Sequence, residues 1–275
     1  MYVCADFGGQ PMDTLLLFSL IQLVVVIFFA ILERLIPYKK YQKDPFWWKI
    51  WLGLGTYACI WLQVLAISWA SVSIPSILDF DLSSSLGCIF FYLFYSHGNY
   101  WFHRLKHSTT WFWQHVHELH HAPRHMEVAL AFFRHPIEIA VNSLYLFFIG
   151  KVLFNVSFEI IFMALIIEGC LETFHHANIH WSRRLDWVGK FIQTPPMHLI
   201  HHQYGRHSDN YSPIFWDYLY GTCNLNSDRE VEKIGLSGRL GSKIGDLDLT
   251  IRSLLYKVCE LVTKITNNKY SIKKH

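Results

Sequence analysis

The stretch Thr14–Ile36, TLLLFSLIQLVVVIFFAILERLI, points to the fold class of the chain. No charged side chain occurs in it before Glu33. An apolar run of this length can cross the hydrocarbon core of a bilayer as a single helix. It is longer than the apolar core of a signal peptide, and no small-residue cleavage pattern follows it. We therefore predict a retained membrane helix.

The composition also indicates a membrane protein. Of the 275 residues, 52% are hydrophobic and only 16% are charged, whereas soluble domains carry about 25% charged residues. The net charge of +3 is small, and no basic patch with a nucleic-acid motif occurs, so we expect no nucleic-acid partner. The six cysteines form no Cys-x-x-Cys pair, which argues against a disulfide framework and a cysteine zinc site.

Four more apolar segments follow along the chain, at about 48–78, 86–102, 137–154 and 156–173. We predict an all-α integral membrane bundle of four or five membrane helices, in which the last two segments either cross the bilayer or form a shallow hairpin. Lysine and arginine residues lie after the first, third and fifth segments, whereas Asp79 and Asp81 lie at the opposite ends. The positive-inside rule then places the histidine-rich stretches on the cytoplasmic side.

Three parts of the chain differ in character. Residues 1–175 hold the predicted membrane helices and the first histidine motifs, at 103–121. Residues 176–225 are more polar and are predicted to form a cytoplasmic, histidine-rich metal-binding cap. In residues 226–275, apolar residues recur at helical spacing between Ile251 and Ile265. We predict an amphipathic tail helix, which either packs on the protein or lies on the bilayer.

Histidine is clustered in repeated patterns. Most of the 17 histidines fall in residues 97–135 and 175–207. His-x-x-x-His patterns begin at His103 and His176, and His-x-x-His-His patterns begin at His117 and His198. Positions i, i+3 and i+4 share one face of a helix, so each pattern is expected to turn two or three imidazoles in one direction. The candidate metal ligands are His103, His107, His117, His120, His121, His176, His180, His198, His201 and His202.

The number of imidazoles indicates two metal ions, because ten exceed what one ion can bind. Neutral imidazole suits iron, copper, zinc and nickel. A site made only of neutral ligands keeps the metals strongly positive, which favours binding of hydroxide, oxide or reduced oxygen. Glu118, Glu168, Glu172 and Asp209 lie near the patterns and are candidate acceptors for the outer ring N–H groups.

Structural roles are predicted for the other clustered histidines, His97, His115, His125, His175 and His207. On a helix, His115 and His175 would point away from the neighbouring motifs by about 100° or more. His135 precedes Pro136, and we expect it either to cap the following segment or to lie near the metals.

Residues 33–222 resemble the fatty acid hydroxylase and sterol desaturase superfamily. The resemblance rests on Glu33–Pro37, Asn99–His107, Trp113–His121, Arg134–Glu138 and Thr194–Thr222. Two departures occur: Arg134 directly precedes His135, and Ser96-His97 stands where an acidic residue is common. The resemblance implies two metal ions at the candidate positions, with His180 matching only some subfamilies.

The function implied by the resemblance is that of a membrane-bound di-iron oxygenase, which hydroxylates or desaturates a fatty acyl or sterol-like lipid with O2. We expect that zinc can replace iron in purified protein. No flavin, haem or nicotinamide motif occurs, so electrons would come from a separate ferredoxin-like or cytochrome b5-like protein. The histidine pattern alone leaves two alternatives open: a membrane zinc transporter and a zinc-dependent lipid hydrolase.

Overall fold

The computed structural model describes residues 11–41, 77–78, 85–225 and 230–236. Within these residues every regular element is a helix, and extended pairing is limited to isolated bridges. This confirms the predicted all-α class. The chain divides into two compact units at Gly235. The predicted tail helix, and all but the last two residues of the apolar run 48–78, lie outside the described residues.

Two of the described helical stretches are long and apolar enough to cross a membrane. The first is Leu16–Leu35, within helix α1 (Pro11–Leu35). The second is Pro136–Leu153, in which α5 (Pro136–Phe147) continues into the π-helix η3 (Phe148–Leu153). The predicted number of four or five membrane helices stays a prediction.

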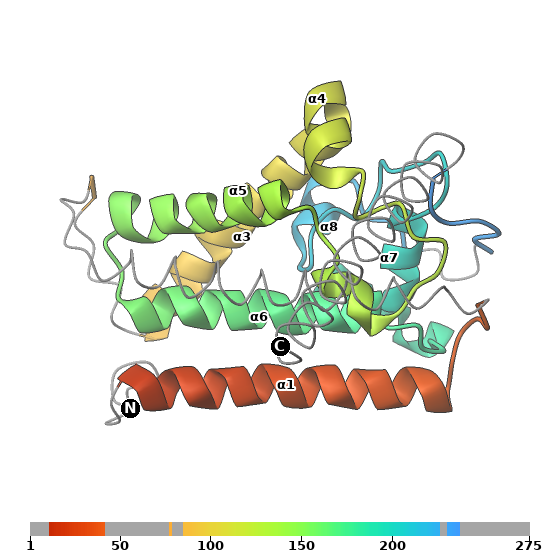
Figure 1. The fold of residues 1–275 in the computed structure, drawn as a ribbon, viewed down its shortest axis with the longest axis horizontal. Coiled ribbons are helices and arrows are strands. Elements are labelled where there is room, and N and C mark those ends of the chain that lie inside the picture. The colour runs from red at the N-terminus through yellow and green to blue at the C-terminus, as the bar shows by residue number, and fades with distance from the viewer. Residues whose placement is uncertain (1–10, 42–76, 79–84, 226–229, 237–275) are drawn as a thin grey trace, which may run out of the picture. The chain divides into compact units, whose positions relative to one another are not determined.

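The other long helices also follow the apolar runs. Helix α3 spans Ser85–Ser108 and α6 spans Phe158–His176. α1 runs alongside α6 (Figure 1), where Val26, Phe29 and Leu32 pack near Phe174. A separate apolar core joins α3, α5, η3 and α6 through Phe91, Tyr95, Leu146, Ile149, Ile161 and Ala164. These contacts fix α3, α5 and α6 as the support for the histidine-rich end.

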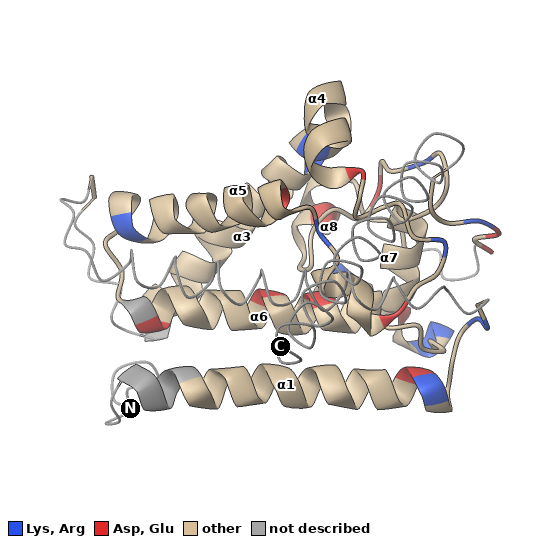
Figure 2. Ribbon diagram, viewed as in Figure 1, with Lys and Arg blue, Asp and Glu red and all other residues tan. Residues whose placement is uncertain are grey.

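Short elements gather at the ends of these long helices. They are α4 (Thr110–Phe112), η1 (Trp113–His117), η2 (Val128–Phe132), η4 (Arg183–Lys190), α7 (Pro195–His201) and α8 (Trp216–Tyr220). Figure 2 shows that many of the charged residues lie at this end, whereas α1 carries none over most of its length.

The first His-x-x-His-His motif does not form a regular α-helix, so the helical geometry assumed from its spacing was wrong. η1 is a π-helix in which the Glu118 N–H donates to the Trp113 carbonyl, and the chain then turns as the His120 N–H donates to the His117 carbonyl. By contrast, the His135 ring caps α5, since its Nδ1 accepts the Ile137 N–H at 3.1 Å. The structure therefore favours the capping alternative for His135.

Candidate metal centre

Five histidines form a first cluster, whose potential ligand atoms all lie within 4.8 Å of one another. Its members are His103 and His107 from α3, His117 and His121 from η1 and the turn after it, and His201 from α7. The Nε2 atom of His103 lies 2.9 Å from that of His117 and 3.1 Å from that of His107. The His121 and His117 Nε2 atoms are 3.2 Å apart.

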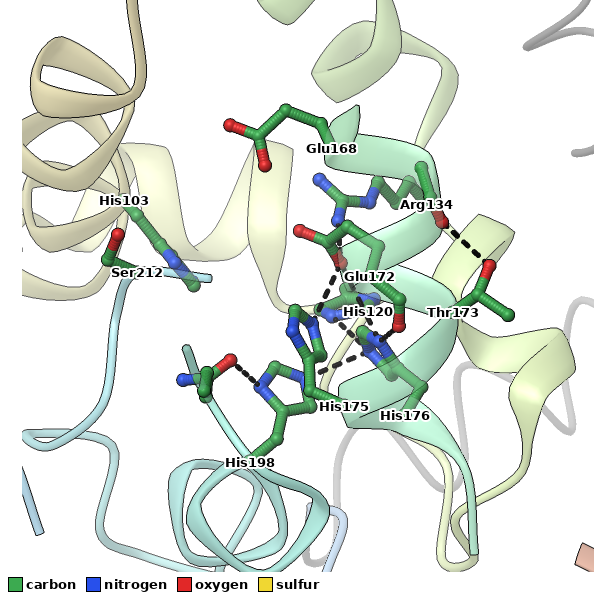
Figure 3. A network of polar contacts seen from close by, with 12 residues as sticks. His103, His120, Arg134, Glu168, Glu172, Thr173, His175, His176, His198 and Ser212 are labelled. Atoms are coloured by element: carbon green, nitrogen blue, oxygen red, sulfur yellow. Dashed lines mark hydrogen bonds and ion pairs between the residues drawn. The ribbon is translucent and has the colours of Figure 1, made fainter. Parts of the chain in front are cut away.

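Four histidines form a second, fully buried cluster: His120, His176, His198 and His202. His176 ends α6, and α7 supplies His198 and brings in His202 directly after it. The His198 Nε2 atom lies 2.9 Å from that of His176 and 3.1 Å from that of His202. Figure 3 shows His120, His176 and His198 converging beside the last turn of α6.

Adjacent residues of each His-x-x-His-His motif belong to different clusters. His120 lies in the second and His121 in the first, while His201 lies in the first and His202 in the second. Each motif therefore turns two of its rings to one cluster and the third to the other, so the predicted common direction holds for two rings and not for all three. Neighbouring side chains in the turn after η1 and at the end of α7 point in different directions, so each motif contributes rings to both clusters.

Six of these nine rings contact an oxygen through Nδ1. The pairs are His103 with Tyr211 O (2.6 Å), His117 with Glu138 Oε1 (2.8 Å), His120 with Phe133 O (3.0 Å), His176 with Glu172 O (2.8 Å), His198 with Gln193 Oε1 (2.9 Å) and His201 with Asp209 O (2.8 Å). Carbonyl and carboxylate oxygens only accept hydrogen bonds, so these contacts assign the ring proton to Nδ1. The Gln193 amide is oriented by its own donation to the Asn210 carbonyl. The lone pairs of the neutral rings are then on Nε2.

This tautomer makes the close Nε2 contacts informative. In the pairs His103–His117, His120–His176 and His176–His198, both rings hold their proton on Nδ1, yet their Nε2 atoms lie 2.9–3.3 Å apart. Two facing lone pairs repel unless a cation is shared between them. Imidazole nitrogens bind zinc at about 2.0–2.1 Å, and two such ligands at right angles are about 3 Å apart. The residues present therefore fit a metal ion in each cluster.

Burial keeps the rings neutral. Loss of solvation is the main cause that lowers the pKa of His120 to about 4 and that of His201 to about 3. The pKa of His121 is held well below its ordinary value by burial and then by His202 beside it. Neutral imidazole is the form that binds metals, so both clusters are prepared for ions without a proton to remove at neutral pH.

A family model described as fatty acid hydroxylase matches residues 88–222. The matched segment begins in α3, ends just after α8 and contains every histidine of both clusters. The chain belongs to the fatty acid hydroxylase and sterol desaturase superfamily. Membership in this superfamily implies an oxidoreductase in general terms. No solved structure matches the chain.

Buried charged side chains surround His117. Glu138 is fully buried, and its Oε1 accepts from His117 Nδ1 at 2.8 Å and from Lys106 Nζ at 2.9 Å. Burial is the main cause lowering the pKa of Lys106, and the Glu138 carboxylate opposes that effect. Arg134 lies 3.8 Å from Glu138 and forms a 2.6 Å ion pair with Glu172 (Figure 3).

Sequence reasoning missed much of this support. Glu138 lies within the Arg134–Glu138 motif, but the sequence predicted no contact with a metal ligand for Glu138, Lys106 or Gln193. A lysine between two candidate ligands, in His103-Arg-Leu-Lys-His107, was the available signal. Among the predicted acceptors, Glu172 and Asp209 contact His176 and His201 through their backbone carbonyls, whereas Glu168 instead accepts from Asn99 at 3.4 Å.

The remaining histidines fall into distinct places. His180 is exposed, and its N–H donates to the Ile36 carbonyl, so the structure brings it into neither cluster. His115 is exposed and stacks on Trp111. His97 contacts the Tyr220 hydroxyl at 2.6 Å, and His207 packs against Trp113 and His121.

His175 lies much closer to the site than its helical position predicted. Its ring is 2% exposed and centred 4.0 Å from that of His198, and its Nε2 lies 3.2 Å from Glu172. The expectation that it points away was wrong, because α7 packs against the end of α6 and its His198 ring contacts the rings of both His175 and His176. Its exclusion as a ligand stays a prediction.

A cavity adjoins both clusters. Its lining includes His103 and His117 of the first cluster and His120 and His198 of the second. The side chains of Asn99, Lys106, Arg134, Glu172, Gln193 and Tyr211 complete most of the wall. A reacting group in this cavity would meet both metal positions at once.

Proposed function

We propose that this protein is a membrane-bound di-iron oxygenase that hydroxylates or desaturates a fatty acyl or sterol-like lipid. The observation that carries the proposal is the pair of clusters, of five and four histidines, that share the walls of one cavity. The proposed iron ligands are His103, His107, His117, His121 and His201 for one ion and His120, His176, His198 and His202 for the other.

The reaction balances with a separate electron source. Hydroxylation consumes O2, two electrons and two protons and yields the alcohol and one water; desaturation yields the alkene and two waters. The iron pair, when bound, would supply the redox chemistry for O2 activation and C–H oxidation. The electrons are proposed to come from a ferredoxin-like or cytochrome b5-like protein.

The chain's own residues hold and shield the site. The outer oxygens fix the ring tautomers, and such partners typically change metal affinity or activity by about 10–100-fold. The Arg134–Glu172 ion pair joins the end of α6 to the segment before α5. Burial of the rings excludes bulk water from their nitrogens, which limits loss of reducing equivalents to side reactions.

We further propose that the protein is a multi-pass membrane protein with this site facing the cytoplasm. α1 has an apolar surface exposed along most of its length, and Arg34 lies in its last turn with Lys39 and Lys40 just beyond. The positive-inside rule then places the histidine-rich end of α1 in the cytoplasm.

The zinc alternatives are less well supported. A transporter is expected to place its histidines and acids along a path within membrane helices, whereas these clusters lie at helix ends. A zinc hydrolase needs about three protein ligands and an open position on one ion, whereas two larger clusters occur here.

The deciding experiment measures metal and oxygen together. Protein purified from iron-rich cells, in lipid, should hold close to two irons per chain and consume O2 only with a donor and a lipid substrate. The zinc-loaded protein is the control and should be inactive. One bound ion with full activity on zinc would refute the proposal and favour hydrolysis.

A further inference from the structure

Six exposed aromatic and apolar side chains lie on three elements that contact one another beside the metal centre. This surface, the aromatic shelf, consists of Trp101 of α3, Trp187 and Phe191 of η4 and its end, and Tyr218, Leu219 and Tyr220 of α8, each 41–60% exposed. Exposed apolar residues scattered singly need no explanation, whereas a contiguous patch marks an interaction surface.

Direct contacts join the three elements of the shelf. The Trp101 and Tyr220 rings are centred 5.0 Å apart, which connects α3 to α8. Lys190 Nζ lies 5.8 Å from the centre of the Tyr218 ring, which connects α8 to η4. The ring centres of Trp187, in η4, and Phe191, just after it, are 6.3 Å apart. α8 therefore contacts both α3 and η4, and the shelf residues lie on three elements that are fixed to one another.

The shelf begins where the candidate span of α1 ends. The His180 N–H donates to the Ile36 carbonyl at 2.8 Å, and Pro37 forms a bridge with Ile179. η4 starts three residues after His180, at Arg183. Figure 1 shows η4, in teal, beside the carboxyl-terminal end of α1. A helix that leaves the hydrocarbon core at Leu35 thus brings η4 to the level of the lipid headgroups.

The chemistry of the shelf fits that level. Tryptophan and tyrosine are enriched at membrane–water interfaces. η4 also carries Arg183, Arg184 and Lys190, and a short amphipathic helix with basic and aromatic residues lies in the interface and is attracted to anionic lipids. A soluble partner would not require the surface to coincide with the end of a span.

We propose that the aromatic shelf lies in the headgroup region of the bilayer and binds an anionic lipid surface. The inference rests on the membrane location proposed above and adds the depth of the site. Gln193, two residues beyond the shelf residue Phe191, holds the ring of His198 at 2.9 Å. Binding of the shelf therefore sets how far the cavity stands from the acyl chains.

The test compares two tryptophans of equal exposure. Trp187 on the shelf and Trp111 on α4 are both 59% exposed. Each is changed to Cys in full-length protein whose six native cysteines have been replaced, labelled with a fluorophore, and placed in vesicles of phosphatidylcholine and phosphatidylglycerol. Quenching by a nitroxide lipid should be several-fold stronger at 187 than at 111, and quenching by aqueous iodide should show the reverse.

Two outcomes would contradict the proposal that the shelf lies in the headgroup region. Equal iodide quenching at both positions would place residue 187 in water. Protection of 187 from both quenchers would show that a protein, either a second copy or a partner, covers it. The Phe191→Cys variant supplies a second reading if Trp187→Cys fails to fold. Neither measurement needs turnover, so a failed shelf is distinguishable from a failed oxygenase.

A second experiment tests whether the basic residues of η4 bind anionic lipid. Replacing Arg183 and Arg184 with Gln should reduce the extra lipid quenching at 187 that phosphatidylglycerol brings over phosphatidylcholine alone. Arg124→Gln with Arg206→Gln, two exposed arginines away from the shelf, is the matched control and should leave that difference unchanged. An equal response of both pairs would overturn the assignment of the basic residues to the lipid surface.

Discussion

The two histidine clusters differ in what holds them. In the first, His117 donates to the buried carboxylate of Glu138, which is neutralised by Lys106. In the second, His198 donates to the neutral amide of Gln193, and His120 and His176 donate to backbone carbonyls. A carboxylate partner makes an imidazole a stronger ligand than a neutral acceptor does.

From this difference we expect the two clusters to bind their proposed ions with different affinities. The first has five rings and an anionic partner, which favours firm binding of its ion. The second has four rings and lies beside the Arg134–Glu172 pair and His175. We therefore expect the ion proposed for the second cluster to be bound less firmly. The predictions below test this asymmetry, beginning with the largest effect.

The strongest test removes two ligands at once. His120→Ala with His202→Ala removes two of the four rings of the second cluster, so one iron per chain should remain. His121→Ala with His202→Ala, a change of position by one residue, takes a ring from each cluster and should leave less iron than the first pair. Activity should be lost in both. Iron per chain is measured by elemental analysis after gel filtration.

Equal iron content in the two double variants would contradict this prediction. If the two double variants retain the same iron, then adjacent histidines do not serve separate ions, and the alternation of each motif between clusters is not used for metal binding. Thermal unfolding of both variants without metal is the control for general damage, because each loses the same two side-chain types.

Replacing Glu138 with Gln should give the next largest effect. His117 then loses its anionic partner, which should lower metal affinity and activity by about 10–100-fold. Lys106 also stays buried without a counter-charge, which costs about 3–5 kcal/mol of stability. Iron titration and thermal unfolding measure the two effects separately.

A second substitution separates charge from ligand support. Adding Lys106→Met to Glu138→Gln removes the unpaired cation, so stability should recover while iron affinity stays low. Recovery of both would mean that Glu138 serves only to neutralise Lys106, and the carboxylate would have no part in holding His117.

Gln193→Leu is the matched change in the second cluster. It leaves the His198 Nδ1–H and the Asn210 carbonyl without their partner, and an unsatisfied buried group costs about 1–3 kcal/mol. Because Gln193 is neutral, we expect a loss of iron affinity at the lower end of about 10–100-fold. A loss larger than that of Glu138→Gln would reverse the proposed order of the two clusters.

The sequence predicted the helical class and the clustering well, because apolar length and histidine spacing are local properties. The apolar run before Glu33 became α1, and nine of the ten candidate histidines gather in two clusters. His180 carried the same spacing from His176, but α6 ends at His176, so the helical relation between them does not exist.

The partition between clusters could not be predicted from spacing. The motif that begins at His117 starts in the last residue of a π-helix and continues in a turn. The sequence pattern did not predict this local structure. Long-range contacts decided the rest: Lys106 meets Glu138 across 32 residues, and the ring of His175 meets that of His198 from a different helix. Such pairs depend on the packing of α3, α5, α6 and α7, and not on any local motif.

The smallest expected effect separates a neighbour from a ligand at His175. His175→Ala removes a buried ring that packs on His198, so the loss of stability should be about 0.5–3 kcal/mol. Both irons should remain, because the four rings of the second cluster and the Arg134–Glu172 pair are untouched, and activity should fall only several-fold. His115→Ala is the control: its ring is exposed on Trp111, and stability, iron and activity should all stay within error of the parent protein. His175→Gln keeps a hydrogen-bonding group near Glu172 and should recover part of the activity. If His175→Ala loses one iron as completely as His198→Ala, then His175 is a fifth ligand, and the difference in ligand number between the clusters disappears.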